Sequence, residues 1–439
     1  MSKFFFIFFS IVSTILLYNS DSLFFSQRVF LTSLIIQYTS LYKIFSNESI
    51  PYSLNKIFYI FCLFFFGIAP SIQSNLNTSS YGARTLKEYE YFYFNILLIF
   101  IMLSYEIFYK LFFLKKLSDI KKIKTSKTYG NKISFRKSMI LCLISVLSLI
   151  IVFYFKDFNI FNMLIRGEGE VKNSAEFSSA SNLIVDQFVR PISIMCLMFY
   201  LLSLKKNRKV LYFLSACALF TCFPLAMPRF YAAAMYIPIL LLIIPQFSKR
   251  NIFSITFIGS LLIIFPFLNQ FRDFSKNAKL KLGFDMRMFT EGHFDSYQNF
   301  ALIFFENITT NGRQLLGVIF FWVPRSIWTD KPVGSGTVLA NELGFYFDNI
   351  SANYFAEGYI NFGLPGILLF LLIFSFVTAK LDVLFWKKLH FERGNYFQIL
   401  YFVMLAMFFF VLRGDLLSSF AFTIGFVMSF FLIYLIVKE

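Results

Sequence analysis

The stretch that decides the fold lies near the end of the chain, where residues 397–438 read FQILYFVMLAMFFFVLRGDLLSSFAFTIGFVMSFFLIYLIVK. Two apolar runs, 397–412 and 416–436, flank a short turn that carries Arg413 and Asp415. A helix of about 20 apolar residues is long enough to cross the hydrocarbon core of a bilayer. This stretch is therefore predicted to form a helical hairpin that crosses a membrane twice.

The rest of the chain repeats this pattern. Of its 439 residues, 58% are hydrophobic and 15% are charged, whereas a soluble domain carries roughly a quarter charged residues. We predict an all-α polytopic membrane protein with about 12 transmembrane helices. The other apolar runs are 4–19, 27–45, 56–72, 90–114, 138–155, 187–204, 210–227, 231–247, 252–268 and 365–385. The first is interpreted as an uncleaved span, because no small-residue cleavage site follows it.

These runs divide the chain into three parts. Residues 1–268 are expected to form a nine-span bundle and residues 365–439 a three-span bundle. Between spans nine and ten lies a large extracytoplasmic loop, 269–364. Its apolar middle, 314–323, is too short to cross a membrane and is interpreted as a membrane-lying or partly re-entrant helix.

The net charge of +17 is distributed as a topology signal. The basic loops 115–137, 205–209, 248–251 and 386–395 all fall on one side when twelve spans are counted along the chain. Since Lys and Arg mark the cytoplasmic side of a membrane protein, both termini are predicted to be cytoplasmic. Basic residues confined to such loops are not typical of nucleic-acid binding, and no nucleic-acid partner is expected.

Arginine has a different distribution from lysine. Lysine dominates the cytoplasmic loops, whereas ten arginines fall in the predicted outer segments. Topology needs only positive charge, but a guanidinium offers a planar fork of donors suited to phosphate and carboxylate. Arginine on the predicted outer side therefore suggests a functional role beyond topology. The ten are Arg28, Arg84, Arg166, Arg190, Arg229, Arg272, Arg287, Arg313, Arg325 and Arg413.

The densest polar feature is WVPRSIWTDKPVGSGTVLANELGF, residues 322–345. Arg325 and Lys331 stand beside a turn with Gly334 and Gly336, where the backbone can approach a ligand closely. One interpretation is a cradle for a diphosphate. The other is an interfacial loop whose Trp and basic residues anchor at lipid headgroups. Residue chemistry alone leaves both open.

Two further polar residues of the outer loop are candidates for proton transfer. Glu357 could accept a proton from a sugar hydroxyl, or serve as the counter-ion of a nearby arginine. His293 is the only histidine of this loop. A neutral imidazole could act as a base, although a surface or hydrogen-bonding role is the alternative.

Three arginines are expected close to the bilayer surface. Arg229 in AMPRFY and Arg413 in VLRGDLLSS lie in very short turns, and Arg272 in NQFRDF follows the ninth run. Charges there are unfavourable unless paired, which makes these residues functional candidates. The alternatives are snorkelling or a salt bridge, for instance between Arg413 and Asp415.

Several classes of site lack support in the sequence. The five cysteines lie inside apolar runs without CxxC spacing, and no phosphate-binding Gly-rich loop or HExxH motif is present. No metal, cofactor or nucleotide is therefore expected. An enzyme of this kind would need a substrate that is already activated, with its energy carried on a lipid.

The stretch PRSIWTDKP…GSGTVLANELG…SANYFAEGYINFGLPG, with the arginine of AMPRFY and the late RGD, resembles the Wzy-type polymerases of O-antigen and capsular polysaccharide repeat units. The layout of spans and late outer loop extends the resemblance over most of the chain. It implies glycosyl transfer between oligosaccharide units linked through diphosphate to undecaprenol. It also implies the periplasmic face of a bacterial cytoplasmic membrane, with a flippase and a chain-length regulator as partners.

The resemblance assigns roles to residues of these motifs. Diphosphate binding and catalysis would fall to Arg229, Arg325 and Arg413, and Glu357 would be the base or orient the acceptor. Substrate binding would involve Arg272, Lys331, His293, Asn353 and Tyr354.

Two rival functions remain open. An O-antigen ligase has the same layout and donor, and would depend on a loop histidine, for which His293 is available. A flippase of lipid-linked oligosaccharide would instead carry its polar residues near the middle of the spans, where most spans of this chain lack charge.

Overall fold

The computed structural model describes residues 2–18, 26–114, 133–165, 179–264, 286–290, 292–389 and 394–438. Regular structure within these ranges is helical throughout, which confirms the predicted all-α class. Among the described residues, seven helical stretches are long and apolar enough to cross a membrane. They are Leu54–Leu76, Glu88–Phe113, Phe135–Tyr154, Ser181–Leu201, Arg208–Ala226, Tyr354–Lys387 and Leu416–Val437.

Each of the predicted apolar runs coincides with a helix. These helices are α1 (Ser2–Tyr18), α2 (Gln27–Phe45), α3 (Leu54–Phe61) with η1 (Cys62–Ile68) and α4 (Ala69–Leu76), α5 (Glu88–Leu114), α6 (Phe135–Tyr154), α9 (Arg190–Leu201), α10 (Arg208–Thr221), α11 (Arg229–Ile243), α12 (Ile252–Gly259) with η6 (Ser260–Ile264), α17 (Tyr354–Leu384), α18 (Phe397–Arg413) and α19 (Leu416–Val437). The described chain also contains shorter apolar helices, such as Lys3–Ile15 and Phe397–Arg413. The number of twelve spans therefore stays a prediction.

Further short helices connect these elements. Before α9 come α7 (Ile160–Leu164), α8 (Ser179–Ile184) and the π-helix η3 (Val185–Val189). Within the predicted loop lie α14 (Ser296–Phe305), α15 (Arg313–Ile319) and α16 (Ser335–Leu343), and α15 matches the short apolar helix expected there. Single turns are η4 (Pro224–Ala226), η5 (Pro245–Ser248), η7 (Met286–Thr290), η8 (Gly292–Phe294) and η9 (Phe385–Leu389).

Helix α17 begins well before the predicted span. Asn353 starts it, because its side-chain oxygen accepts hydrogen bonds from the backbone N–H groups of Phe355 and Ala356. The helix bends at Phe362 and Gly363, and Gly363 has φ 63°, a conformation that glycine adopts without strain. The part before this bend carries Glu357 and lies within the predicted loop 269–364.

The two predicted bundles pack directly against each other. Asp382 of α17 is buried and accepts hydrogen bonds from the backbone N–H groups of Leu54 and Asn55 at the start of α3, at 2.9 and 3.2 Å. The hydroxyls of Tyr109 in α5 and Tyr401 in α18 donate to the same carboxylate. A buried carboxylate is tolerated when donors surround it. Asp382 thus joins four helices from both halves of the chain.

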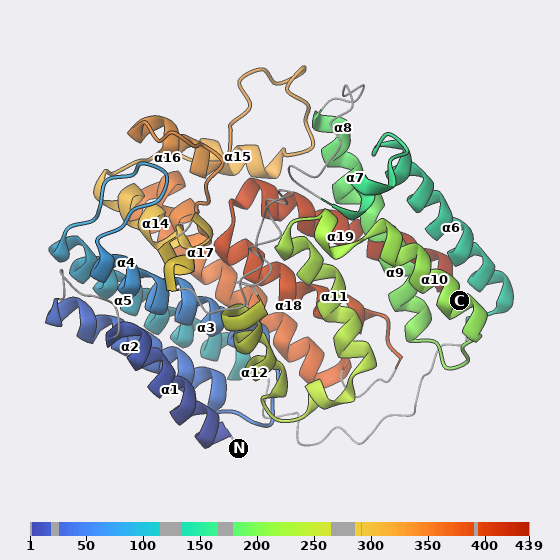
Figure 1. The fold of residues 1–439 in the computed structure, drawn as a ribbon, viewed down its shortest axis with the longest axis horizontal. Helices are drawn as coiled ribbons and strands as arrows, with labels where there is room; N and C mark the ends of the chain where they lie inside the picture. The colour runs from blue at the N-terminus through green and yellow to red at the C-terminus, as the bar shows by residue number, and fades with distance from the viewer. Residues whose placement is uncertain are drawn as a thin grey trace.

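The outer segment lies at one end of the bundle. In Figure 1, α14, α15 and α16 gather at the upper edge, whereas the N-terminus is marked at the lower edge. The outer ends of α18 and α19 lie close to this group.

Candidate functional site

The candidate site is built around the turn from Arg413 to Leu416, which joins α18 to α19. On one side, Arg413 contacts the chain just before α14. On the other side, Asp415 and Leu416 contact the start of α16 and Glu357 of α17. Three other parts of the chain therefore contact this turn: the segment before α14, the start of α16 and the first part of α17.

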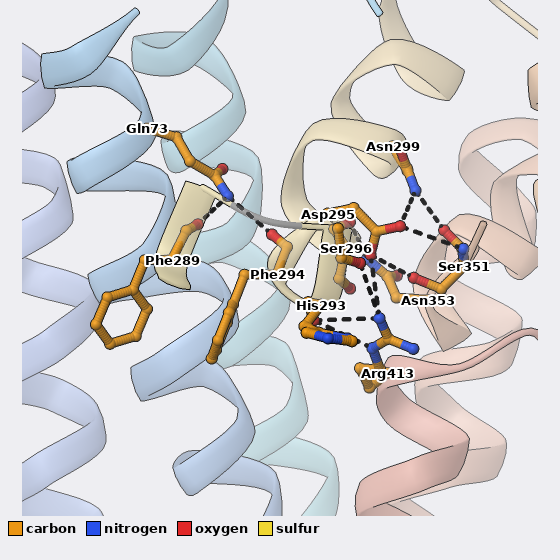
Figure 2. Close-up of polar contacts among 11 residues, drawn as sticks. Gln73, Phe289, His293, Phe294, Asp295, Ser296, Asn299, Ser351, Asn353 and Arg413 are labelled. Carbon is orange, nitrogen blue, oxygen red and sulfur yellow. Dashed lines mark hydrogen bonds and ion pairs between the residues drawn. The ribbon is translucent and has the colours of Figure 1, made fainter. Parts of the chain in front are cut away.

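The guanidinium of Arg413 is held along one edge. Its Nε and Nη2 donate to the carbonyl oxygen of His293 at 3.3 and 3.2 Å, and Nη2 also donates to that of Gly292 at 3.1 Å. Nη2 forms an ion pair with Asp295 at 3.5 Å. The third nitrogen, Nη1, points away from these contacts in Figure 2 and makes no hydrogen bond within the described part of the chain. With 28% of its side chain exposed, Arg413 has a free edge for an anion.

Asp295 fixes the position of this guanidinium. It is 1% exposed and accepts hydrogen bonds from Ser351 Oγ at 2.7 Å and from Asn299 Nδ2 at 3.0 Å. Burial raises the pKa of the Asp295 carboxyl, against the lowering by Arg413 and by these donors. A carboxylate held on several sides is a rigid partner for Arg413, as Figure 2 shows.

On the other side of the turn, Glu357 and Asp415 connect α16, α17 and α19. Glu357 is 1% exposed and accepts from Ser335 Oγ at 2.7 Å and from the backbone N–H of Leu416 at 3.0 Å. Asp415 accepts from the backbone N–H of Leu417 and so begins α19, and it also accepts from that of Gly336. Burial raises the pKa of the Asp415 carboxyl, while backbone N–H donors lower it. The two carboxylates thus hold the start of α16 against the start of α19.

These contacts show that two of the ion pairs suggested by the sequence are not formed. Arg413 pairs with Asp295, and the suggested ion pair between Arg413 and Asp415 is not formed, because Asp415 faces backbone donors of its own helix and of Gly336. Glu357 was expected to be a base or the counter-ion of an arginine. Its carboxylate is occupied by Ser335 and Leu416, and it makes no ion pair with the described arginines.

The predicted cation pair beside the Gly turn holds its own loop. Arg325 donates to the carbonyl oxygens of Lys331 and Pro332 at 2.7 and 3.2 Å. Lys331 Nζ donates to those of Phe321 and Val323 at 2.6 and 2.9 Å. Burial and the neighbouring Arg325 lower the pKa of Lys331. The two cations lie together as expected, but neither contacts Glu357 or Arg413.

Asn353 and Tyr354 have roles in the fold. Asn353 begins α17 and donates from Nδ2 to the carbonyl oxygen of Ser296 at 3.0 Å. The buried ring of Tyr354 packs against Phe370 and Phe374. Both residues therefore stabilise the helix that carries Glu357.

Arg229 and His293 lie near the turn. Arg229 is the first residue of α11, and the next residue, Phe230, stacks on Phe410 with ring centroids 3.5 Å apart, about one turn before Arg413 in α18. His293 meets Arg413 through its backbone carbonyl. Arg272 lies outside the described residues.

Other outer arginines belong to structural ion pairs. Arg84 binds Glu90 and Glu306 at 2.8 and 2.7 Å. Arg190 is buried and pairs with Asp186 at 3.1 Å. An arginine on this side is thus not by itself a sign of ligand binding.

The structure adds residues that are not among the predicted site residues. Asp295, Asn299, Ser335 and Ser351 each bind a predicted site residue or its direct partner. The local signal for the first two is the polar run EGHFDSYQN, in which Asn299 follows its partner Asp295 by four residues. The pairs of Asp295 with Arg413 and of Ser335 with Glu357 are too far apart in the sequence to be matched by spacing.

The described residues include no group of three His, Cys, Asp or Glu side chains placed to hold a metal ion. Comparison of the chain with protein-family models, curated protein sequences and solved structures gives no match.

Proposed function

We propose that this protein polymerises oligosaccharide repeat units linked through diphosphate to a polyprenol such as undecaprenol. The observation that carries the proposal is the way the Arg413 guanidinium is held. One edge of its guanidinium is fixed by Asp295 and two backbone carbonyls, and the other edge makes no hydrogen bond with the described residues, at the end of an apolar helical bundle. A guanidinium in this position suits the diphosphate of a lipid whose tail lies in the bilayer.

The reaction places few demands on the protein. The bond between the anomeric carbon and the diphosphate oxygen breaks, and a hydroxyl oxygen of the acceptor unit forms a new bond to that carbon. The acceptor proton passes to solvent, and the bond electrons leave with the diphosphate. Arg413 would stabilise the negative charge that develops there, since fixed donors lower such a barrier. Arg229, at the start of α11 next to Phe230, which stacks on Phe410 of α18, is our candidate for a second cation.

Glu357 would act as a positioning residue in this scheme. It fixes Leu416, three residues after Arg413, and so sets the geometry of the turn. Its buried carboxylate is already occupied by Ser335 Oγ and the Leu416 N–H. Arg272 would contact a more distant part of the substrate, whereas Arg325 and Lys331 hold their own loop.

The proposal includes a topology and partners. Twelve spans with both termini in the cytoplasm would place the Arg413 turn at the periplasmic face of a bacterial cytoplasmic membrane. A flippase would deliver the lipid-linked units there, and a chain-length regulator would stop the polymer. No metal or nucleotide enters the proposed reaction.

A reconstituted reaction tests the proposal. Purified protein in lipid nanodiscs is mixed with a polyprenyl-diphosphate-linked repeat unit, with EDTA and without nucleotide, and the products are separated by length. A ladder is expected from the unaltered chain and from Arg28→Ala, a matched exposed outer arginine. Arg413→Ala is expected to give single units only. The absence of a ladder from the unaltered chain, or an unchanged ladder from Arg413→Ala, would contradict the proposal.

The ligase alternative has one observation in its favour, the position of His293 next to Arg413. A His293→Ala variant separates the two functions. A polymerase of the proposed kind keeps its ladder, because the contact with Arg413 is made by the backbone carbonyl. A ligase with a histidine base loses transfer to a lipid A core acceptor.

A further inference from the structure

We propose that α15 and the segment that follows it, residues 313–333, form a membrane-interface surface that lies among the headgroups of a leaflet containing anionic lipid. This inference rests on residues other than those of the Arg413 site. It concerns how the outer segment contacts the bilayer.

Helix α15 exposes apolar side chains that a helix on a water-facing surface would bury. Gln314, Gly317 and Val318 are buried against the bundle, whereas Leu316 and Ile319 are exposed. A surface helix in water places its apolar residues inward. An exposed apolar face is stable where lipid covers it, which is the arrangement of an interfacial helix.

The exposed face continues onto the candidate spans. The residue before α15, Gly312, lies against the ring of Phe362, and Phe362 and Leu364 begin the exposed apolar side of α17. Just after α15, Phe321 packs edge-on against Phe420 of α19 at 5.9 Å. Helix α15 therefore joins the outer ends of two candidate spans, at the upper edge of the bundle in Figure 1. This is the depth at which the hydrocarbon gives way to headgroups.

The following segment combines exposed aromatic and apolar side chains. Trp322 is 68% exposed and Ile327 is 78% exposed. The ring of Phe320 lies 6.5 Å from those of Trp322 and Trp328. Tryptophan is enriched at membrane–water interfaces, where its ring is partly buried and its N–H stays near water.

Positive charge in the same segment favours an anionic leaflet. Residues 313–333 contain three cations, Arg313, Arg325 and Lys331, and one acid, Asp330. Arg313 and Arg325 are exposed and donate to carbonyl oxygens of residues 330–332. These bonds hold the segment in shape and keep both guanidinium groups at the surface. Each basic residue at an anionic surface contributes about 1 kcal/mol of attraction.

Tryptophan fluorescence tests the surface, because the chain has only three tryptophans. A variant with Trp328→Phe and Trp386→Phe keeps Trp322 alone, and it is reconstituted in vesicles with lipids brominated at a shallow or a deep position of the acyl chain. Quenching by shallow bromines is expected to exceed that by deep bromines about twofold, with little quenching by aqueous acrylamide. Strong acrylamide quenching without bromine quenching would overturn the proposal.

A matched variant keeps Trp386 alone, through Trp322→Phe and Trp328→Phe. Trp386 is buried and donates to the carbonyl oxygen of Tyr52. Acrylamide is expected to quench it little, which shows that the bundle is intact in the reconstituted protein. The same measurement on both variants separates a misfolded preparation from a misplaced surface.

A second measurement tests the charge. With Trp322 as the only tryptophan, quenching by shallow bromines is expected to rise when phosphatidylglycerol replaces phosphatidylcholine, and Arg313→Gln with Arg325→Gln is expected to remove the rise. Free inorganic phosphate should leave it unchanged. A rise that survives the double substitution, or that phosphate abolishes, would overturn the anionic-lipid part. The glycan ladder is read separately, so loss of this surface and loss of polymerase activity are distinguishable.

Discussion

Substitution of Glu357 separates a positioning role from a catalytic one. In the structure the Glu357 carboxylate accepts from Ser335 Oγ at 2.7 Å and from Leu416 N at 3.0 Å. In Glu357→Gln, the amide oxygen can still accept from Leu416 N, and the amide nitrogen can donate to the Ser335 hydroxyl. Glu357→Ala removes both contacts and leaves the Leu416 N–H buried without an acceptor.

The magnitudes differ clearly between the two variants. Loss of the Ser335 hydrogen bond costs about 1 kcal/mol, and an unmet buried N–H costs about 1–3 kcal/mol. The cavity left by the side chain adds about 1 kcal/mol. Glu357→Ala should therefore lower the free energy of unfolding by about 4 kcal/mol, and Glu357→Gln by less than about 1 kcal/mol.

Stability is measured by equilibrium unfolding in mixed detergent micelles, and activity by the glycan ladder. Glu357→Gln should keep its activity within about threefold, whereas the misplaced turn of Glu357→Ala should lower it about 100-fold. Ser335→Ala, which removes one contact from the other side, should cost about 1 kcal/mol. A Glu357→Gln protein that is stable but inactive would refute the positioning role, since only the ability to take up a proton has been lost.

Three further predictions concern the same turn. Arg413→Lys should abolish the ladder with little loss of stability. The lysine ammonium lacks the planar fork of donors with which a guanidinium binds two carbonyls and an anion at once. An active lysine variant would contradict this prediction. Gly336→Ala should destabilise the fold by at least about 2 kcal/mol in the same unfolding assay, since a Cβ there would overlap the carbonyl oxygen of Ile350; a neutral effect would show that α16 can move. Burial raises the pKa of the Asp295 carboxyl, whereas in the unfolded chain this pKa is about 3.9. At pH values between the two, Asp295 keeps its proton in the folded chain and has lost it in the unfolded chain. Stability should therefore fall as the pH rises from about 4 through the folded pKa, and Asp295→Asn should remove this slope in unfolding measured across that range.

The grouping of site residues shows where sequence reasoning stops. Asn353, Tyr354 and Glu357 fall in one motif and were expected to act on one substrate. In the structure, Asn353 begins the helix, Tyr354 packs into the core and Glu357 contacts Leu416. Asn353 precedes the helix, and Tyr354 and Glu357, three positions apart, share nearly the same helix face, so only the packing of distant segments decides what each one contacts.

For the predicted cations, the sequence predicted which residues lie together but not which groups they bind. Sequence reasoning placed Arg325 and Lys331 together, and they are neighbours. It could not foresee that both donate to backbone carbonyls of their own loop, because loop carbonyls have no sequence signature. Arg190 was grouped with the possible ligand-binding arginines, although Asp186, four residues earlier and one helical turn away, is its partner.

The sequence by itself determined that this chain is a set of apolar helices separated by short basic loops and one long polar segment. That information is local, because each run contains its own hydropathy and its own backbone hydrogen bonds. The tertiary structure alone decided that Arg413 meets Asp295, 118 residues away, and that Glu357 meets Leu416, 59 residues away. Such pairs depend on how helices pack and on which buried polar groups must satisfy one another, and no spacing within a single segment encodes them.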